Sequence, residues 1–170
     1  VSTDQDSQEI MAPILNQYEG KIKYSSLKLE RSFDFGKWTL HNSIIYQMIN
    51  QNEDILNLPQ FMSRNTLFFS ERIFRNTLAI QTGLNFKIFS KYYANEYNPL
   101  ISDFHIQNQK KIGSFPLFDF FFNAKIRQTK IFIIAEHINS SFTGNNFYST
   151  PESVYRDFGV RFGFKWNLFN

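Results

Sequence analysis

The C-terminal stretch DFGVRFGFKWNLFN, residues Asp157–Asn170, has a strict two-residue period. Phe, Val, Trp and Leu side chains occupy alternate positions from 158 to 168, and Gly or polar side chains occupy the positions between them. Because successive side chains of a β-strand point to opposite faces, this stretch predicts a strand with one apolar and one polar face. An apolar face this rich in aromatic residues suits a strand that contacts lipid on one side and a water-filled lumen on the other.

The composition of the chain narrows the other possibilities. Its 170 residues include 21 Phe and no Cys, and its formal net charge is +3. No run reaches about 18 apolar residues, which excludes a membrane-spanning helix. The absence of Cys excludes a disulfide framework and a thiolate metal site. Because Lys and Arg are scattered rather than clustered, the sequence does not support a nucleic-acid interface.

Seven strand-like segments recur along the chain, and each is long enough for the roughly 9–11 residues that a tilted membrane strand needs. They are Lys21–Phe35, Lys37–Ile49, Phe61–Arg72, Asn76–Lys91, Phe115–Arg127, Lys130–Ser141 and Asp157–Phe169. Short turns alternate with long connections at residues 50–60, 92–114 and 142–156. Short turns at one end and long loops at the other are typical of a transmembrane antiparallel up-and-down β-barrel. Bacterial barrels have an even number of strands and at least eight, so we expect seven C-terminal strands of a larger barrel.

The N-terminal residues do not continue this pattern. We expect residues 1–20 to form a loop or upstream segment, with a short helical stripe over Ser7–Asn16, and residues 21–170 to form the barrel strands. The first residues, VSTDQDSQEI, lack the basic and apolar regions of a signal peptide. An exported protein needs such a signal, so we expect the signal to have been removed or the chain to be part of a longer protein.

A soluble β-sandwich also has alternating strands and is the alternative fold. Long strands, alternating loop lengths and aromatic residues near the strand ends favour the barrel, because aromatic belts mark both membrane–water interfaces. The expected loop-end belt is Tyr92, Tyr93, Phe115, Phe142, Phe147, Tyr148 and Tyr155. The expected turn-end belt is Phe35, Trp38, Phe74, Trp166 and Phe169.

The polar faces of the clearest strands supply candidate lumen-facing residues. They are Gln81, Asn85, Lys87, Asp119, Asn123, Lys125, Arg127, Arg161 and Lys165. Five are basic and one is acidic, which would bias a wet pore towards anions. The same residues would equally suit a structural ladder, paired with one another and with a plug. Phe121 is an apolar exception on its polar face, and the pattern leaves the facing of Phe61–Arg72 and Lys130–Ser141 undetermined.

The last strand also matches the assembly signal of outer-membrane barrels, a polar residue and a Gly followed by alternating aromatic or apolar residues. The matching residues are Arg161, Gly163, Trp166, Leu168 and Phe169. Since an unpaired strand edge is a template for another strand, barrel-assembly machinery could capture this terminus.

No catalytic or metal motif stands out. His41, His105 and His137 lack metal-ligand spacing, and His137 with Ser140 or Ser141 is the one nearby pair that a barrel hydrolase could use. We therefore expect no enzyme activity, cofactor or metal. The two longest connections are long enough to fold inward as a constriction or to bind a partner.

Several runs resemble the C-terminal part of the putative porin family of Bacteroidota outer membranes, over about residues 19–169. The most specific are QTGLNF (81–86), KYYANEYNP (91–99), FFNAKIRQTKIF (121–132) and AEHINSSFTGNNFYS (135–149). The resemblance implies a large single-chain outer-membrane barrel acting as a diffusion pore, without catalytic residues to transfer. Members of that family have many more strands before this point.

These observations together predict an outer-membrane porin through which small polar solutes diffuse passively. The alternative is a non-conducting barrel that serves as a scaffold or accessory subunit of a larger outer-membrane complex, including one bound to assembly or secretion machinery. The expected partners are outer-membrane lipid, barrel-assembly machinery and other outer-membrane subunits, and no nucleic acid.

Overall fold

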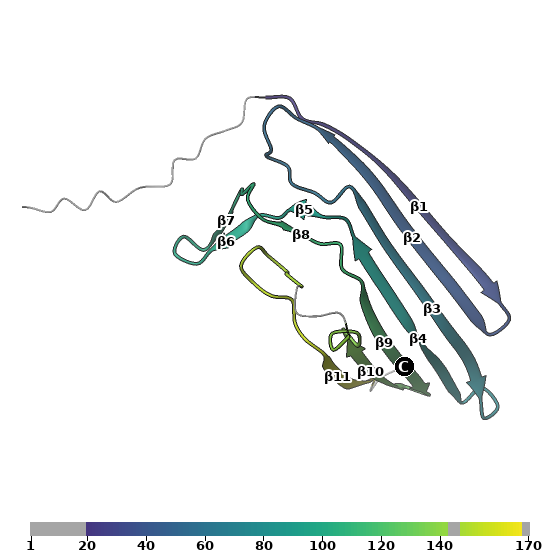
Figure 1. Cartoon of the computed structure of the whole chain (residues 1–170). Helices are drawn as coiled ribbons and strands as arrows, with labels where there is room; N and C mark the ends of the chain where they lie inside the picture. The colour runs from purple at the N-terminus through teal and green to yellow at the C-terminus, as the bar shows by residue number, and fades with distance from the viewer. Residues whose placement is uncertain (1–19, 143–146, 168–170) are drawn as a thin grey trace, which may run out of the picture.

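A computed structural model of the chain describes residues 20–142 and 147–167 (Figure 1). The described residues form strands and connections without a helix. The strands are β1 (Lys23–Phe35), β2 (Trp38–Asn50), β3 (Phe61–Ile73), β4 (Leu78–Phe89), β5 (Tyr92–Tyr93), β6 (Glu96–Asn98), β7 (Asp103–His105), β8 (Lys111–Ile112), β9 (Leu117–Ile126), β10 (Thr129–Glu136) and β11 (Gly159–Trp166). The helical stripe expected over Ser7–Asn16, and Leu168 and Phe169 of the expected assembly signal, lie outside the described residues.

Seven long strands form one antiparallel sheet in the order β1-β2-β3-β4-β9-β10-β11. Each long strand after β1 pairs with the long strand that precedes it in sequence, which is the up-and-down topology that the sequence predicts. The sheet is curved but not closed, since β1 and β11 do not pair with each other. This confirms the all-β prediction and is consistent with part of a larger barrel. No helix among the described residues is long and apolar enough to cross a membrane.

The seven strands lie where the alternation predicts them, and the differences are at their ends. β9 starts after Pro116, which has no N–H for a strand ladder, and ends before Arg127, whose φ of 51° turns the chain. β10 ends at Glu136 instead of Ser141, because His137 has a φ of 52°. The expected strand start at Asn76 is also wrong: Asn76 has a φ of 68° and belongs to the β3–β4 turn.

Short and long connections alternate as predicted. The turns that follow β1, β3 and β9 are short and lie at one end of the sheet, which we call the turn end (Figure 1). The connections after β2, β4 and β10 are long and lie at the loop end. The β4–β9 connection contains two small antiparallel pairs, β5–β8 and β6–β7, and the β6–β7 hairpin projects away from the strands on the inner side of the sheet.

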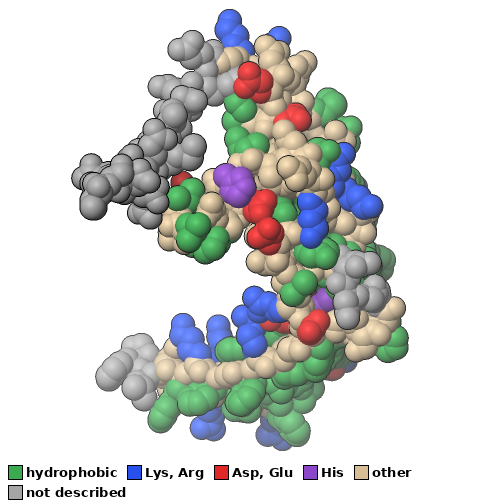
Figure 2. Space-filling model, turned by 60° about the vertical axis from the view of Figure 1, so that its left-hand side comes forward, with side chains coloured by type: hydrophobic (Ala, Val, Ile, Leu, Met, Phe, Trp, Pro, Cys, Tyr) green, Lys and Arg blue, Asp and Glu red, His purple; other side chains and the backbone are tan. Residues whose placement is uncertain are grey.

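The sheet has two chemically different faces (Figure 2). The outer side, here the convex face, carries large apolar side chains that remain exposed, such as Leu27, Phe162 and Phe164. The inner side, here the concave face, carries the Lys and Arg side chains of the C-terminal strands. One cross-strand row interrupts the apolar convex face, where Arg31, Asn42 and Asn65 lie opposite one another on β1, β2 and β3.

The buried core of the described residues lies at the loop end rather than inside the sheet. Phe115, Leu117 and Phe147 are buried together, with Phe89 and Tyr155 packed against them. Three of these aromatic residues, Phe115, Phe147 and Tyr155, were expected in the loop-end belt, and Phe115 and Phe147 are buried. Their burial corrects that expectation, because their rings pack on each other at 4.9 Å between centroids instead of facing lipid.

Candidate functional site

The concave face is the candidate site, because it gathers most of the polar residues singled out from the sequence. Gln81, Asn85 and Lys87 lie on β4; Asp119, Asn123 and Lys125 lie on β9; Arg161 and Lys165 lie on β11. The cross-strand register places these eight on one face of the sheet. The ninth, Arg127, lies in the turn after β9 and does not belong to the face of that strand.

Asp119 connects three strands near the loop end of this face. Its carboxylate receives an ion pair from Lys87 Nζ at 2.6 Å and accepts a hydrogen bond from the backbone N–H of His137 at 3.0 Å. Asp119 is buried, so each of these contacts replaces water that the carboxylate has lost. The pair therefore belongs to the structural ladder that the sequence left open as an alternative.

Amide side chains extend this ladder across the middle of the sheet. Asn85 accepts hydrogen bonds from Thr66 Oγ1 at 3.0 Å and from Arg64 Nε at 3.4 Å. Nearer the turn end, Asn123 Nδ2 donates to Gln81 Oε1 at 3.5 Å. These contacts join β3, β4 and β9 through side chains as well as through the backbone.

Strands β1 and β2 carry a second polar ladder that the sequence analysis did not single out. Ser43 Oγ donates to Glu30 at 3.1 Å, and Thr39 Oγ1 donates to Asp34 at 2.7 Å. The sequence could have predicted this ladder from the alternating polar positions of β1, which are Lys28, Glu30, Ser32 and Asp34. The concave face thus has its β1 carboxylates at one edge of the sheet and lysines at the other.

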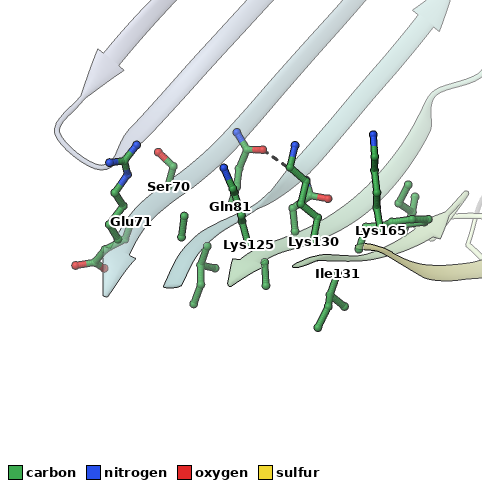
Figure 3. Close-up of a pocket in the computed structure, with 14 residues that line it drawn as sticks. Ser70, Glu71, Gln81, Lys125, Lys130, Ile131 and Lys165 are labelled. Atoms are coloured by element: carbon green, nitrogen blue, oxygen red, sulfur yellow. Dashed lines mark hydrogen bonds between the residues drawn. The ribbon is translucent and has the colours of Figure 1, made fainter. Parts of the chain in front are cut away.

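The turn end of the concave face is strongly basic over β9, β10 and β11. Lys130 of β10 pairs in register with Lys125 on one side and with Lys165 on the other. All three point to the same side of the sheet as Gln81, whereas Ile131 points to the opposite side (Figure 3). They line a hollow of about 660 Å³. The sequence analysis did not select Lys130, because the apolar run that follows it shows no alternation and so does not indicate which face of the sheet Lys130 occupies.

Aromatic side chains on the concave face lie beside glycines. Gly83 pairs with Phe68 of β3 and with Phe121 of β9, the residue that broke the predicted alternation. Gly163 pairs with Phe132, and a Cβ at position 163 would come within 2.7 Å of that ring. The missing side chains make room for the rings, which explains how a polar face accommodates three phenylalanines.

His137 at the loop end is almost completely buried, with 1% of its surface exposed. Its Nδ1 lies 2.8 Å from the Arg156 carbonyl oxygen, and its ring packs edge-on against Phe147 and Tyr155. Within the described residues its Nε2 has no hydrogen-bond partner. This geometry ties the β10–β11 connection to the end of β10. No group of three or more His, Asp or Glu in the described chain is placed to hold a metal ion.

The described residues of the expected assembly signal lie on the edge strand β11. Arg161 forms an ion pair with Glu136 of β10, and Gly163 lies beneath the Phe132 ring. Trp166 lies on the convex face and is 61% exposed. β11 pairs with β10 alone in the described sheet, so its other edge carries unpaired backbone groups.

Comparison with known proteins agrees with this architecture. Residues 3–170, almost the whole chain, match a family model described as putative porin. No curated protein and no solved structure matches the chain. A curved antiparallel sheet with an apolar convex face and a polar concave face is the arrangement that a porin wall requires. The chain belongs to the putative porin family.

Proposed function

We propose that this chain forms part of the wall of an outer-membrane porin, whose concave face lines a wet lumen for passive diffusion of small polar solutes. The pore would select solutes by their size and charge, so the proposal includes no enzymatic turnover and no cofactor. Outer-membrane lipid would cover the convex face, and barrel-assembly machinery would act on the edge of β11 during biogenesis.

One observation carries this proposal, the exposure of the apolar convex face. Phe162 is 82% exposed, Phe164 76% and Leu27 70%. A protein surrounded by water rarely exposes a contiguous apolar area of this extent, because each buried Å² of apolar surface contributes roughly 25 cal/mol. Lipid satisfies such a face without a second protein layer, while water on the other side hydrates the charged concave face.

The row of Arg31, Asn42 and Asn65 favours the second candidate function, an accessory subunit of a larger outer-membrane complex. Asn65 Nδ2 donates to Ser63 Oγ at 2.9 Å, and the Arg31 guanidinium lies 5.0 Å from the centre of the Phe33 ring. Charged side chains on a lipid-facing surface are costly, so this polar row suits a protein contact better than lipid. A porin wall whose convex face contacts lipid, except where a partner protein covers the polar row, accounts for both the exposed apolar face and this row.

Ion conductance of the full-length protein in planar lipid bilayers tests the proposed pore. We expect stepwise, ohmic conductance increments that persist without added energy source or substrate. Full-length protein that inserts without conducting would contradict the pore and favour the scaffold. A variant lacking the β6–β7 hairpin, residues 95–107, tests whether this hairpin narrows the pore. If it does, the conductance of the variant should exceed that of the unaltered protein.

A further inference from the structure

We propose that the turn end of the concave face is a binding site for small multivalent oxyanions, so that the pore selects phosphate-like or polycarboxylate solutes. The inference rests on the proposed function, because solutes would reach this site through the lumen. The site itself is defined by four cationic side chains. Arg72, Lys125, Lys130 and Lys165, here the cationic row, occupy one line across the sheet.

The register of the sheet defines the cationic row. Arg72 of β3 pairs with Ala79 of β4, and Ala79 pairs with Lys125 of β9. Lys125 pairs with Lys130 of β10, which pairs with Lys165 of β11. Four steps of about 4.8 Å between neighbouring strands give the row a length of roughly 19 Å. Every position in this line is a cation except the small Ala79.

The neighbouring row towards the loop end supplies neutral hydrogen-bond groups. Ser70 pairs with Gln81, and Gln81 pairs with Asn123. Ser70 and Asn123 each lie two residues from a member of the cationic row, and Gln81 lies two residues from Ala79. All of these side chains line the same hollow of about 660 Å³. Lys and Arg heads on flexible stems, with hydroxyl and amide donors next to them, form the donor set that oxyanions require.

The cationic row lacks the partners that the other concave-face cations have. Lys87 pairs with Asp119, and Arg161 pairs with Glu136. Among the described residues no ion pair involves Arg72, Lys125, Lys130 or Lys165. Of the described residues that line the hollow, Glu71 is the one acid, and its carboxylate pairs with Lys37. No ion pair among the described residues therefore compensates the positive charge in this hollow.

Such an arrangement has a cost that a ligand would remove. Like charges directly opposite each other on neighbouring strands destabilise a sheet, and Lys130 has a lysine on both sides. A multivalent oxyanion between the ammonium groups converts this repulsion into charge-assisted hydrogen bonds. A monovalent anion such as chloride satisfies fewer of these donors, so the row favours ions with several oxygens and more than one negative charge.

Thermal unfolding of the full-length protein in neutral detergent tests the site without requiring conductance. Inorganic phosphate is the probe, added to a chloride buffer of constant ionic strength, so that phosphate cannot come from lipid. We expect phosphate to raise the unfolding midpoint of the unaltered protein, because a ligand bound to the native state stabilises it. Lys130→Gln should instead raise the midpoint without phosphate, since it removes repulsion, and weaken apparent phosphate affinity roughly tenfold.

A triple variant and a charge-matched control complete the experiment. Lys125→Gln, Lys130→Gln and Lys165→Gln together should abolish the phosphate-dependent shift. Lys23→Gln removes the same single charge as Lys130→Gln, but from β1 outside the row, and should keep the full shift. A phosphate shift that survives in the triple variant, or one absent from the unaltered protein, would overturn the site. Loss of conductance with an intact phosphate shift would overturn the pore and leave the anion site standing.

Discussion

Glycines decide how closely the strands of the concave face approach bulky side chains. A Cβ at Gly83 would lie 2.3 Å from the Leu67 carbonyl oxygen and 2.7 Å from Phe68 Cα, both of which are backbone atoms. At Gly163 the same Cβ would meet the far end of the Phe132 ring, which can move. At Gly159 nothing lies within 4 Å. The three positions therefore form a graded series within one sheet.

We expect Gly83→Ala to lower the free energy of unfolding by about 1–3 kcal/mol, because the backbone of β3 must shift to accept the methyl group. Gly163→Ala should cost less, since the Phe132 ring can rotate away, and Gly159→Ala should be neutral. Urea-dependent unfolding of the three variants in the same detergent measures these differences. Equal stability of Gly83→Ala and Gly159→Ala would contradict the close packing at Gly83.

Strands were predictable from the sequence wherever apolar and polar residues alternate. β4 and β11 have clean alternation, and both strands lie within the predicted segments with the expected facing of their polar residues. For β10 the sequence did not predict which side chains face the concave side. The four consecutive apolar residues Ile131–Ile134 show no alternation that would decide it. The pairing of β10 with β9 determines which side chains face the concave side, because it places Lys130 opposite Lys125. The cationic row depends on this register, which no local pattern contains.

The long connections were the least predictable elements, because their order comes from contacts between distant residues. His137 joins β10 to the Arg156 carbonyl 19 residues later, and Phe147 and Tyr155 pack around its ring. A histidine between a strand and a loop gives no local signal for such burial. The sequence therefore suggested a possible catalytic partner for His137, whereas the contacts in the structure show an anchor for the β10–β11 connection.

His137→Ala should loosen this connection and leave the sheet intact. The variant loses the hydrogen bond to Arg156 and the ring contacts, which we expect to reduce the free energy of local opening by about 2 kcal/mol. Cleavage of residues 137–158 by a protease should then rise on the order of thirtyfold, as expected when cleavage follows the open population. His105→Ala is the control, because its pair with Glu96 at 3.6 Å lies partly exposed to solvent and contributes little. Equal cleavage of both variants would contradict the anchor.

At the scale of the whole molecule, the two faces of the sheet differ in their side chains. Its convex face exposes aliphatic and aromatic side chains over most of its area, and its concave face carries paired polar ladders and the cationic row. A soluble sandwich would need a second layer over the convex face, and the described residues provide none. If the sheet is the proposed wall between lipid and water, the two sides of one strand should respond oppositely to the same substitution.

Neighbouring isoleucines of β10 test this directly. Ile133 lies on the convex face between Phe122 and Phe162, while Ile134 lies on the concave face between Phe121 and Arg161. Ile133→Lys places a charge against lipid, and we expect it to cost about 2–4 kcal/mol and to reduce insertion into lipid vesicles. Ile134→Lys adds the same charge to the wet side, so it should insert normally and change ion selectivity instead. Folding yield in vesicles of neutral lipid compares the two variants. If both fold equally well, the convex face does not contact lipid, and the porin wall is the wrong description of this sheet.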